Sequence, residues 1–170
     1  MTLLTAQGTP IHPQELPLFA KDGWSIPNEI GQEWNPIQRR EIVKFAPQLP
    51  SARLRSVSGV YNCAGLVFAS RRTVIYRMEL LYEILRHDGY RKIGPPPVAM
   101  EGDVVIYVED DTGQPAHIGI IMKIEPRIAD ATFDTTVLSK WGLHGEYIHR
   151  LECVPEIHGK PKEFWSERVV

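Results

Sequence analysis

The sequence predicts an α+β fold in which helices come first and an antiparallel sheet follows. Apolar side chains recur at helical spacing between residues 35 and 88, and runs rich in β-branched residues begin at residue 104. Short turns separate these runs, which favours hairpins over helical crossovers. With 170 residues, 43% of them hydrophobic, the chain can bury a substantial core. We therefore expect a single domain, 1–170, with about four to six strands.

The first stretch, residues 1–34, is dense in proline and glycine with interspersed tryptophans, which predicts an irregular segment packed through aromatic side chains. Asn35 followed by Pro36 is typical of a helix start, because asparagine caps the first amides and proline needs no amide partner there. This helix should end before Pro47. Its expected packing contacts are Ile37, Ile42, Val43 and Phe45.

Two further helices are expected before the sheet. The apolar window Cys63–Ser70 follows a turn marked by Asn62, so it predicts a short buried helix beginning at the cysteine. Residues 73–87 have the clearest helical period, and Asp88 with the glycine after it should end that helix. Arg71 and the basic residues beyond it are interpreted as the solvated face of a helix.

The predicted strands are Val104–Val108, Ala116–Ile124 and Thr132–Leu138, of which the first two form a hairpin. A second hairpin turn is expected at Gly142–Gly145, and the C-terminal stretch 151–170 should pack back across the sheet. Three polar residues at the second hairpin either line the edge of the cleft or, as we expect, are solvated: His144, Glu146 and His149.

Charge and hydropathy exclude several classes of function. The 19 basic and 21 acidic residues give a net charge of −2, so no basic field attracts nucleic acid, and no nucleic-acid motif is present. The N-terminus lacks the regions of a signal peptide, and no run approaches membrane-spanning length. We expect a cytoplasmic protein, or one exported by a route that reads no N-terminal signal.

Cys63 has the sequence context of a nucleophile. A thiolate is the reactive form of cysteine, and the free N–H groups at the start of a helix stabilise it. The same backbone amides would suit an oxyanion hole. A lone cysteine is also commonly a small buried hydrophobe, so the position by itself does not establish catalysis.

His117 lies in a run that we interpret as a strand buried on both faces. Gly119, two residues on, shares its face and leaves space in front of the imidazole. The residue is either a general base or a core histidine bonded to a backbone carbonyl.

Three segments in order, Asn62–Val67, Glu101–Tyr107 and His117–Ile121, resemble the papain-like NlpC/P60 and CHAP superfamily of cysteine peptidases and amidases. The resemblance implies a papain-like NlpC/P60 type of fold, with N-terminal helices packed on an antiparallel β-sheet. It also implies that Cys63 is the nucleophile and His117 the general base. Asn62 would support the cysteine or bind substrate.

The same resemblance divides the chain into an N-terminal extension and helix, 1–55, a catalytic core, 56–150, and a C-terminal segment, 151–170. It implies a third residue that orients the histidine, for which Asp130 and the pair Ser139–Lys140 are candidates. Ser139 is the better orienter, because a lysine cannot accept from an imidazole N–H. Lys140 would act electrostatically on substrate or oxyanion. The neighbouring Trp141 is either a substrate platform or a core anchor.

The implied function is a thiol hydrolase that cleaves an amide, peptide or isopeptide bond through an acyl-enzyme, without a metal or organic cofactor. The substrate would be a peptide or a peptidoglycan-like molecule, so the chain could be a cell-wall amidase or an antibacterial effector. Acyl transfer uses the same pair of residues. The alternative is a catalytically silent papain-like domain that binds a peptide or protein. A third reading makes residues 1–34 the interaction surface of a toxin or immunity partner.

Two other uses of the cysteines and histidines are possible. The two cysteines and six histidines show no paired spacing of the kind that structural zinc sites use, so we expect no metal site. Cys63 and Cys153 are the only possible disulfide pair, and nothing in the sequence indicates a secretory context for it. We interpret Cys153 as an inert buried thiol.

Overall fold

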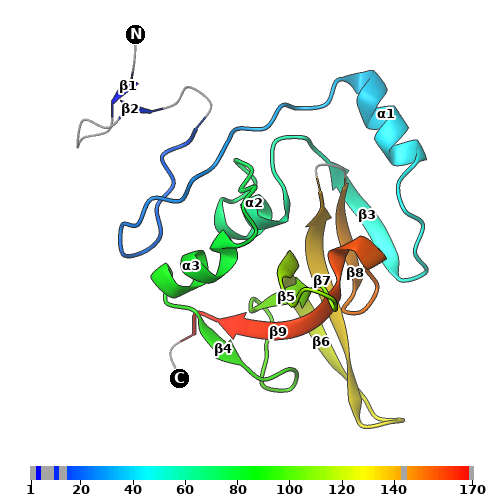
Figure 1. The fold of residues 1–170 in the computed structure, drawn as a ribbon. Helices are drawn as coiled ribbons and strands as arrows, with labels where there is room; N and C mark the ends of the chain where they lie inside the picture. The colour runs from blue at the N-terminus through cyan, green and yellow to red at the C-terminus, as the bar shows by residue number, and fades with distance from the viewer. Residues whose placement is uncertain (1–2, 5–9, 12–14, 143–144, 169–170) are drawn as a thin grey trace.

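A seven-stranded antiparallel sheet dominates the molecule (Figure 1). The structure is a computed structural model that describes residues 3–4, 10–11, 15–142 and 145–168. The strand order is β3-β8-β7-β6-β5-β9-β4. In chain order the strands are β3 (Ala52–Val57), β4 (Arg91–Ile93), β5 (Val104–Val108), β6 (Pro115–Arg127), β7 (Thr132–Trp141), β8 (Gly145–Arg150) and β9 (Lys160–Ser166). A separate two-stranded pair comprises β1 (Leu3–Leu4) and β2 (Pro10–Ile11).

The expected fold of helices packed on a sheet is wrong, because the helices are few and short. They are α1 (Pro36–Lys44), α2 (Cys63–Phe68), α3 (Leu80–His87) and the 3-10 helix η1 (Glu156–His158). The longest has 9 residues, whereas β6 has 13 and β7 has 10. The chain therefore builds its core on the sheet, and only α2 and α3 contribute buried side chains from α-helices.

The helix expected at 73–87 begins only at Leu80. Val74 instead forms a β-bridge with Glu29, in which each amide donates to the other carbonyl, at 2.7 and 2.9 Å. The next amide, that of Ile75, donates to the side chain of Asn62 at 3.2 Å. These bonds to distant residues replace the intrahelical ones, and β-branched residues in this stretch suit the extended backbone.

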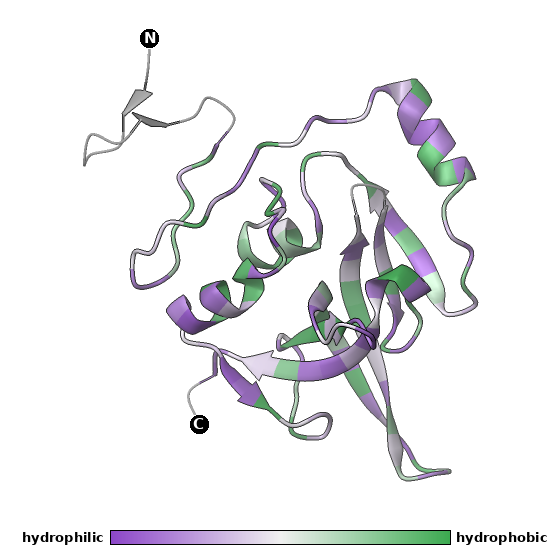
Figure 2. Ribbon diagram, in the orientation of Figure 1, coloured by the Kyte–Doolittle hydropathy of each residue, from purple (hydrophilic) through white to green (hydrophobic). Residues whose placement is uncertain are grey.

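The predicted start of α1 is confirmed. Asn35 accepts from the amides of Ile37 and Gln38, and Gln38 bonds back to the amide of Asn35, forming a capping box. The expected packing is wrong, because the helix has no buried residue, and Figure 2 shows it as largely hydrophilic. Its largest apolar side chain, Phe45 at the C-cap, is 74% exposed.

The predicted strands are confirmed, with extensions. The strands predicted at 116–124 and 132–138 continue into a long hairpin, since β6 and β7 pair from Gly119 with Ser139 out to Arg127 with Thr132. The second hairpin joins β7 to β8, although part of its predicted turn, His144 included, lies outside the described residues. The expectation for the C-terminal segment holds only in part, because residues 151–158 pack on one face of the sheet, whereas β9 enters the sheet between β5 and β4.

The two faces of the sheet have separate cores. Ile106 pairs with Ile118, and both face α2 and α3 in one core, which we call the helix face. Their neighbours Tyr107 and His117 also pair, and they point to the other side, the opposite face, because side chains alternate along a strand. Residues of the segment 151–158, with η1, pack on this opposite face.

Candidate functional site

Asn62 fixes the start of α2 and therefore the position of Cys63. Its side-chain oxygen accepts from the amide of Gly65 at 3.0 Å, and its side-chain nitrogen donates to the carbonyl of Ile75 at 2.8 Å. A side chain on Gly65 would lie 1.8 Å from the carbonyl oxygen of Thr73, so only glycine permits this approach. The predicted helix start is confirmed, and Asn62 is its cap.

Cys63 lies on the helix face with 6% of its surface exposed. Burial raises the pKa of its thiol, although the backbone amides of Ile118, Ala64 and Cys63 itself, with the positive charge of Lys140, act in the opposite direction. The sulfur thus faces the groups that stabilise a thiolate or an oxyanion, while its resting form is the thiol.

His117 is not beside Cys63. It is fully buried on the opposite face, where its ring lies 4.3 Å from that of His158 and 5.3 Å from that of Tyr107, between centroids. Neither ring nitrogen has a hydrogen-bond partner among the described residues. The structure therefore does not bring the expected nucleophile and base together, because one residue along β6 changes the face.

Ser139 shares the opposite face with His117 but bonds to another histidine. Its hydroxyl oxygen lies 2.8 Å from Nε2 of His149 and accepts from the indole nitrogen of Trp141 at 3.1 Å. Trp141 is 3% exposed and stacks on Tyr147 with centroids 3.7 Å apart. Of the two interpretations of Trp141, the structure supports the core anchor.

His117 and His149 are buried on the opposite face, and His158 is partly buried beside His117. The expectation that His149 is solvated is therefore wrong. Burial lowers the pKa of His117 well below its ordinary value, with a smaller contribution from the nearby His158 and His149. Burial also lowers the pKa of His149, and that of His158 to about 4. All three are therefore neutral near pH 7. Within the described residues no cluster of histidine, cysteine or carboxylate side chains is arranged to hold a metal ion.

Lys140 lies on the helix face, on the same side of the sheet as Cys63. Its side chain is fully buried, and its ammonium lies 5.2 Å from the centre of the Tyr61 ring. Burial lowers the pKa of Lys140 to about 8, against the opposing effects of Glu146, Cys63 and Glu33. At this pKa about a tenth of the amine is unprotonated at pH 7, and this fraction can accept a proton.

Glu146 is the residue across from Lys140 in the β7–β8 ladder. The expectation that it is solvated is wrong, because it is fully buried and accepts hydrogen bonds from Tyr61, Arg71 and Arg55. Burial would raise the pKa of Glu146, but these donors outweigh it and lower the pKa overall. The carboxylate is therefore ionised and forms the centre of a charged network beside Lys140.

Arg71 is exposed, as expected, but it lies in the turn between α2 and α3 and not on a helix face, and its guanidinium binds Glu146. The sequence contains a usable signal for this network. Charged residues are rarely buried unless they are paired. Lys140 and Glu146, which flank the hairpin turn next to apolar residues, therefore indicate a buried network of charged side chains. The sequence does not show that these two residues pair across the hairpin turn, because this depends on the register of β7 and β8.

Asp130, the other candidate for the third residue, belongs to the tip of the β6–β7 hairpin. It accepts from the Arg127 guanidinium at 2.9 Å and from the Thr132 hydroxyl at 2.6 Å. Both cysteines are free, and Cys153 is partly buried.

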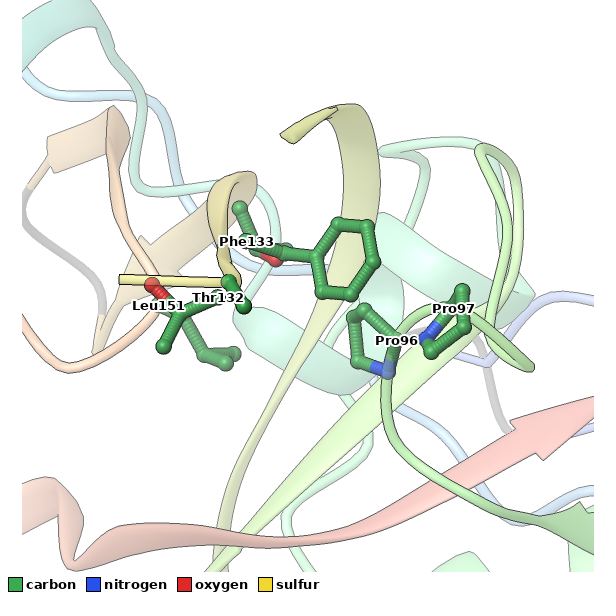
Figure 3. Close-up of a pocket in the computed structure, with 7 residues that line it drawn as sticks. Pro96, Pro97, Thr132, Phe133 and Leu151 are labelled. Carbon is green, nitrogen blue, oxygen red and sulfur yellow. The ribbon is translucent and has the colours of Figure 1, made fainter. Parts of the chain in front are cut away.

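Three surface hollows are lined by residues other than Cys63. One of about 410 Å³ lies where the ring of Phe133 faces Pro96 and Pro97 (Figure 3). Another of about 430 Å³ adjoins Pro97 and Met100, and a third of about 550 Å³ is bordered by the β5–β6 turn and η1. None of these three hollows is lined by Cys63 or Lys140.

Comparison of the chain with protein-family models, curated proteins and solved structures found no match in any of the three. The resemblance drawn from the sequence motifs therefore stays a prediction. Among the helices of the described residues, none combines the length and the apolar character needed to cross a membrane. The site must be judged on its own geometry.

Proposed function

We propose that the chain is a thiol hydrolase of amide, peptide or isopeptide bonds, with Cys63 as nucleophile and Lys140 as general base. The observation that carries the proposal is the placement of Cys63 at the start of α2, on the face of the sheet that also buries Lys140. The positive charge of Lys140 and the backbone amides at the sulfur act to lower the pKa of the thiol. Lys140 replaces His117 in this role because His117 lies on the opposite face of the sheet.

The reaction follows from the protonation states of the pair. The Lys140 amine takes the thiol proton, and the sulfur attacks the carbonyl carbon to form a tetrahedral intermediate. Backbone amides around Cys63 hold the oxyanion. The Lys140 ammonium then protonates the leaving amine, which gives a thioester. Water, deprotonated by Lys140, attacks this thioester, releases a carboxylic acid and restores the thiol.

The same chemistry indicates the class of substrate and the cellular location of the enzyme. A peptide or a peptidoglycan-like chain carries the amide bonds that this chemistry cleaves, so a cell-wall amidase or an antibacterial effector is included. That use places the enzyme outside the cytoplasm, whereas a protein or isopeptide substrate fits a cytoplasmic enzyme. Residues 1–34 would offer a surface for a protein partner.

A second candidate is a catalytically silent domain that binds a peptide or protein. The observation in its favour is the burial of Cys63, which leaves 6% of the residue exposed and raises the pKa of its thiol. In this case Cys63 is a packed core residue, and Lys140 serves only the charged network with Glu146.

The two candidates differ in whether Cys63 takes an acyl group. We expect p-nitrophenyl acetate to acetylate Cys63 in a burst that mass spectrometry detects, and the burst rate to rise as pH increases through about 8, where Lys140 loses its proton. Lys140→Met should slow acetylation at pH 7 by at least about a hundredfold. Cys63→Ala should abolish the adduct, and Cys153→Ala should leave it unchanged.

The controls separate the alternatives. An equal burst in wild type and Lys140→Met would exclude the lysine as base. A Cys63 that is no more reactive than Cys153 at any pH would favour the silent binding domain. Circular dichroism of each variant shows whether a lost burst reflects chemistry or unfolding.

A further inference from the structure

Two backbone irregularities direct arginines to the same carboxylate. Arg55 lies at a bulge in β3, where the pairing with β8 shifts between Leu54 and Ser56. Ser70 and Arg71, after α2, have φ of 48° and 66°, a region that non-glycine residues rarely adopt. A β-bulge next to an active site often redirects a side chain. A positive φ costs a non-glycine residue about 1 kcal/mol or more. Strain of this kind is typical of functional positions.

The contacts show what the irregular backbone achieves. Arg71 donates from Nε to one oxygen of Glu146 at 2.7 Å and from Nη2 to the other at 3.4 Å, and Arg55 donates from Nη1. The side chain of Glu146 is 0% exposed, whereas those of Arg55 and Arg71 are 49% and 40% exposed. A guanidinium carries five N–H groups, so both arginines are fixed by the buried acid and still present donors to solvent.

The surroundings are cationic and adjoin the nucleophile. Arg55 and Arg71 are both paired with Glu146, and Lys140 lies opposite this carboxylate in the β7–β8 ladder, while the nearby Glu33 is paired with Arg39. The amide of Arg71 donates to the carbonyl of Gly65 at 3.0 Å, which ties the arginine to the helix that begins with Cys63. An excess of positive charge therefore lies on the same side of the sheet as Cys63.

We infer that Arg55 and Arg71 form a carboxylate-binding site that selects acidic acyl groups or peptides for reaction at Cys63. Glu146 is the positioning residue that holds both guanidinium groups. The identity of the substrate rests on the proposed function. Binding of a carboxylate by Arg55 and Arg71 does not, and it can be measured by itself. A carboxylate is the matching ligand because an arginine fork bonds its two oxygens together.

The test compares two reagents that alkylate cysteine and differ mainly in charge. Iodoacetate carries a carboxylate, and iodoacetamide is neutral. We measure the rate of each at Cys63 by peptide mass spectrometry and use Cys153 in the same molecule as reference. In the wild-type protein, the ratio of the iodoacetate rate to the iodoacetamide rate should be about tenfold higher at Cys63 than at Cys153. Arg71→Gln and Arg55→Gln should each lower the ratio at Cys63 severalfold while the iodoacetamide rate stays constant.

Arg53→Gln is the matched control, because it removes the same charge from the same strand, and it should leave the ratio unchanged. Equal ratios in wild type and both arginine variants would overturn the inference. If Cys63 reacts with neither reagent, glutarate should still raise the melting temperature of Cys63→Ala more than sodium chloride of equal ionic strength does, and lack of that shift would also overturn it. These readouts are independent of turnover, so the proposed hydrolase can fail in the acetylation assay while the carboxylate site stands.

Discussion

The two faces of the sheet bury titratable residues in opposite ways. On the helix face, Lys140 and Glu146 lie side by side, and the carboxylate is saturated by hydrogen bonds. On the opposite face, three histidines pack among aromatic rings, and His117 has no hydrogen bond in the described structure. The helix face thus keeps the Glu146 carboxylate charged by pairing it with arginines, whereas the opposite face keeps its imidazoles neutral by burial. Reactive chemistry is expected where charge is retained.

The helix face should be the more sensitive to a single deletion. Glu146→Ala leaves Lys140 without its neighbouring carboxylate and leaves Arg55, Arg71 and the Tyr61 hydroxyl without their shared acceptor. Removing one partner of a buried ion pair costs about 3–5 kcal/mol. Urea unfolding should show a loss in this range. A loss below about 1 kcal/mol would mean that solvent already screens the network.

The opposite face should respond to acid. The pKa of His158 in the folded protein is about 4, below the ordinary 6.5, and the pKa values of His117 and His149 are also lowered. Such groups contribute stability fully above pH 6.5 and lose it as pH falls toward 4, because the unfolded chain binds the protons first. For His158 the loss is about 3 kcal/mol.

Unfolding free energies measured from pH 7 to pH 4 in wild type and His158→Gln check this. Glutamine does not titrate in this window, so the variant should show a shallower decline with acid. Parallel curves for the two proteins would contradict the assignment of the acid response to this residue.

Much of the local structure could be read from the sequence. The cap at Asn35, the helix start at Cys63 and the strands β5, β6 and β7 were predictable because each depends on neighbouring residues. The strands β3, β4 and β9, which raise the sheet to seven strands from the expected four to six, were not predicted. The helix expected at 73–87 was not, since the bridge from Val74 to Glu29 is a contact between distant segments. Long-range pairing overrides local periodicity in such cases.

The candidate site was predicted only in part, for a related reason. Cys63 was found because its signal, a cysteine at a helix start, is local. The partner of Cys63 depends on which face of a strand each residue occupies, and a shift of one residue exchanges His117 for Ile118. Lys140 and Glu146 meet through the register of β7 and β8, which neither residue specifies by itself.

The smallest expected effect also separates the two faces most sharply. His117→Leu replaces a fully buried imidazole, both of whose nitrogens lack partners in the described structure, with an apolar side chain. Because the unpaired polar atoms are removed, we expect the free energy of unfolding to increase by about 1 kcal/mol, after allowance for the lost ring contact with His158. Acetylation of Cys63 should keep its wild-type rate, since Lys140 is the base. A stable variant that no longer acetylates would instead assign the base to His117 and require the strand to present that residue to the helix face.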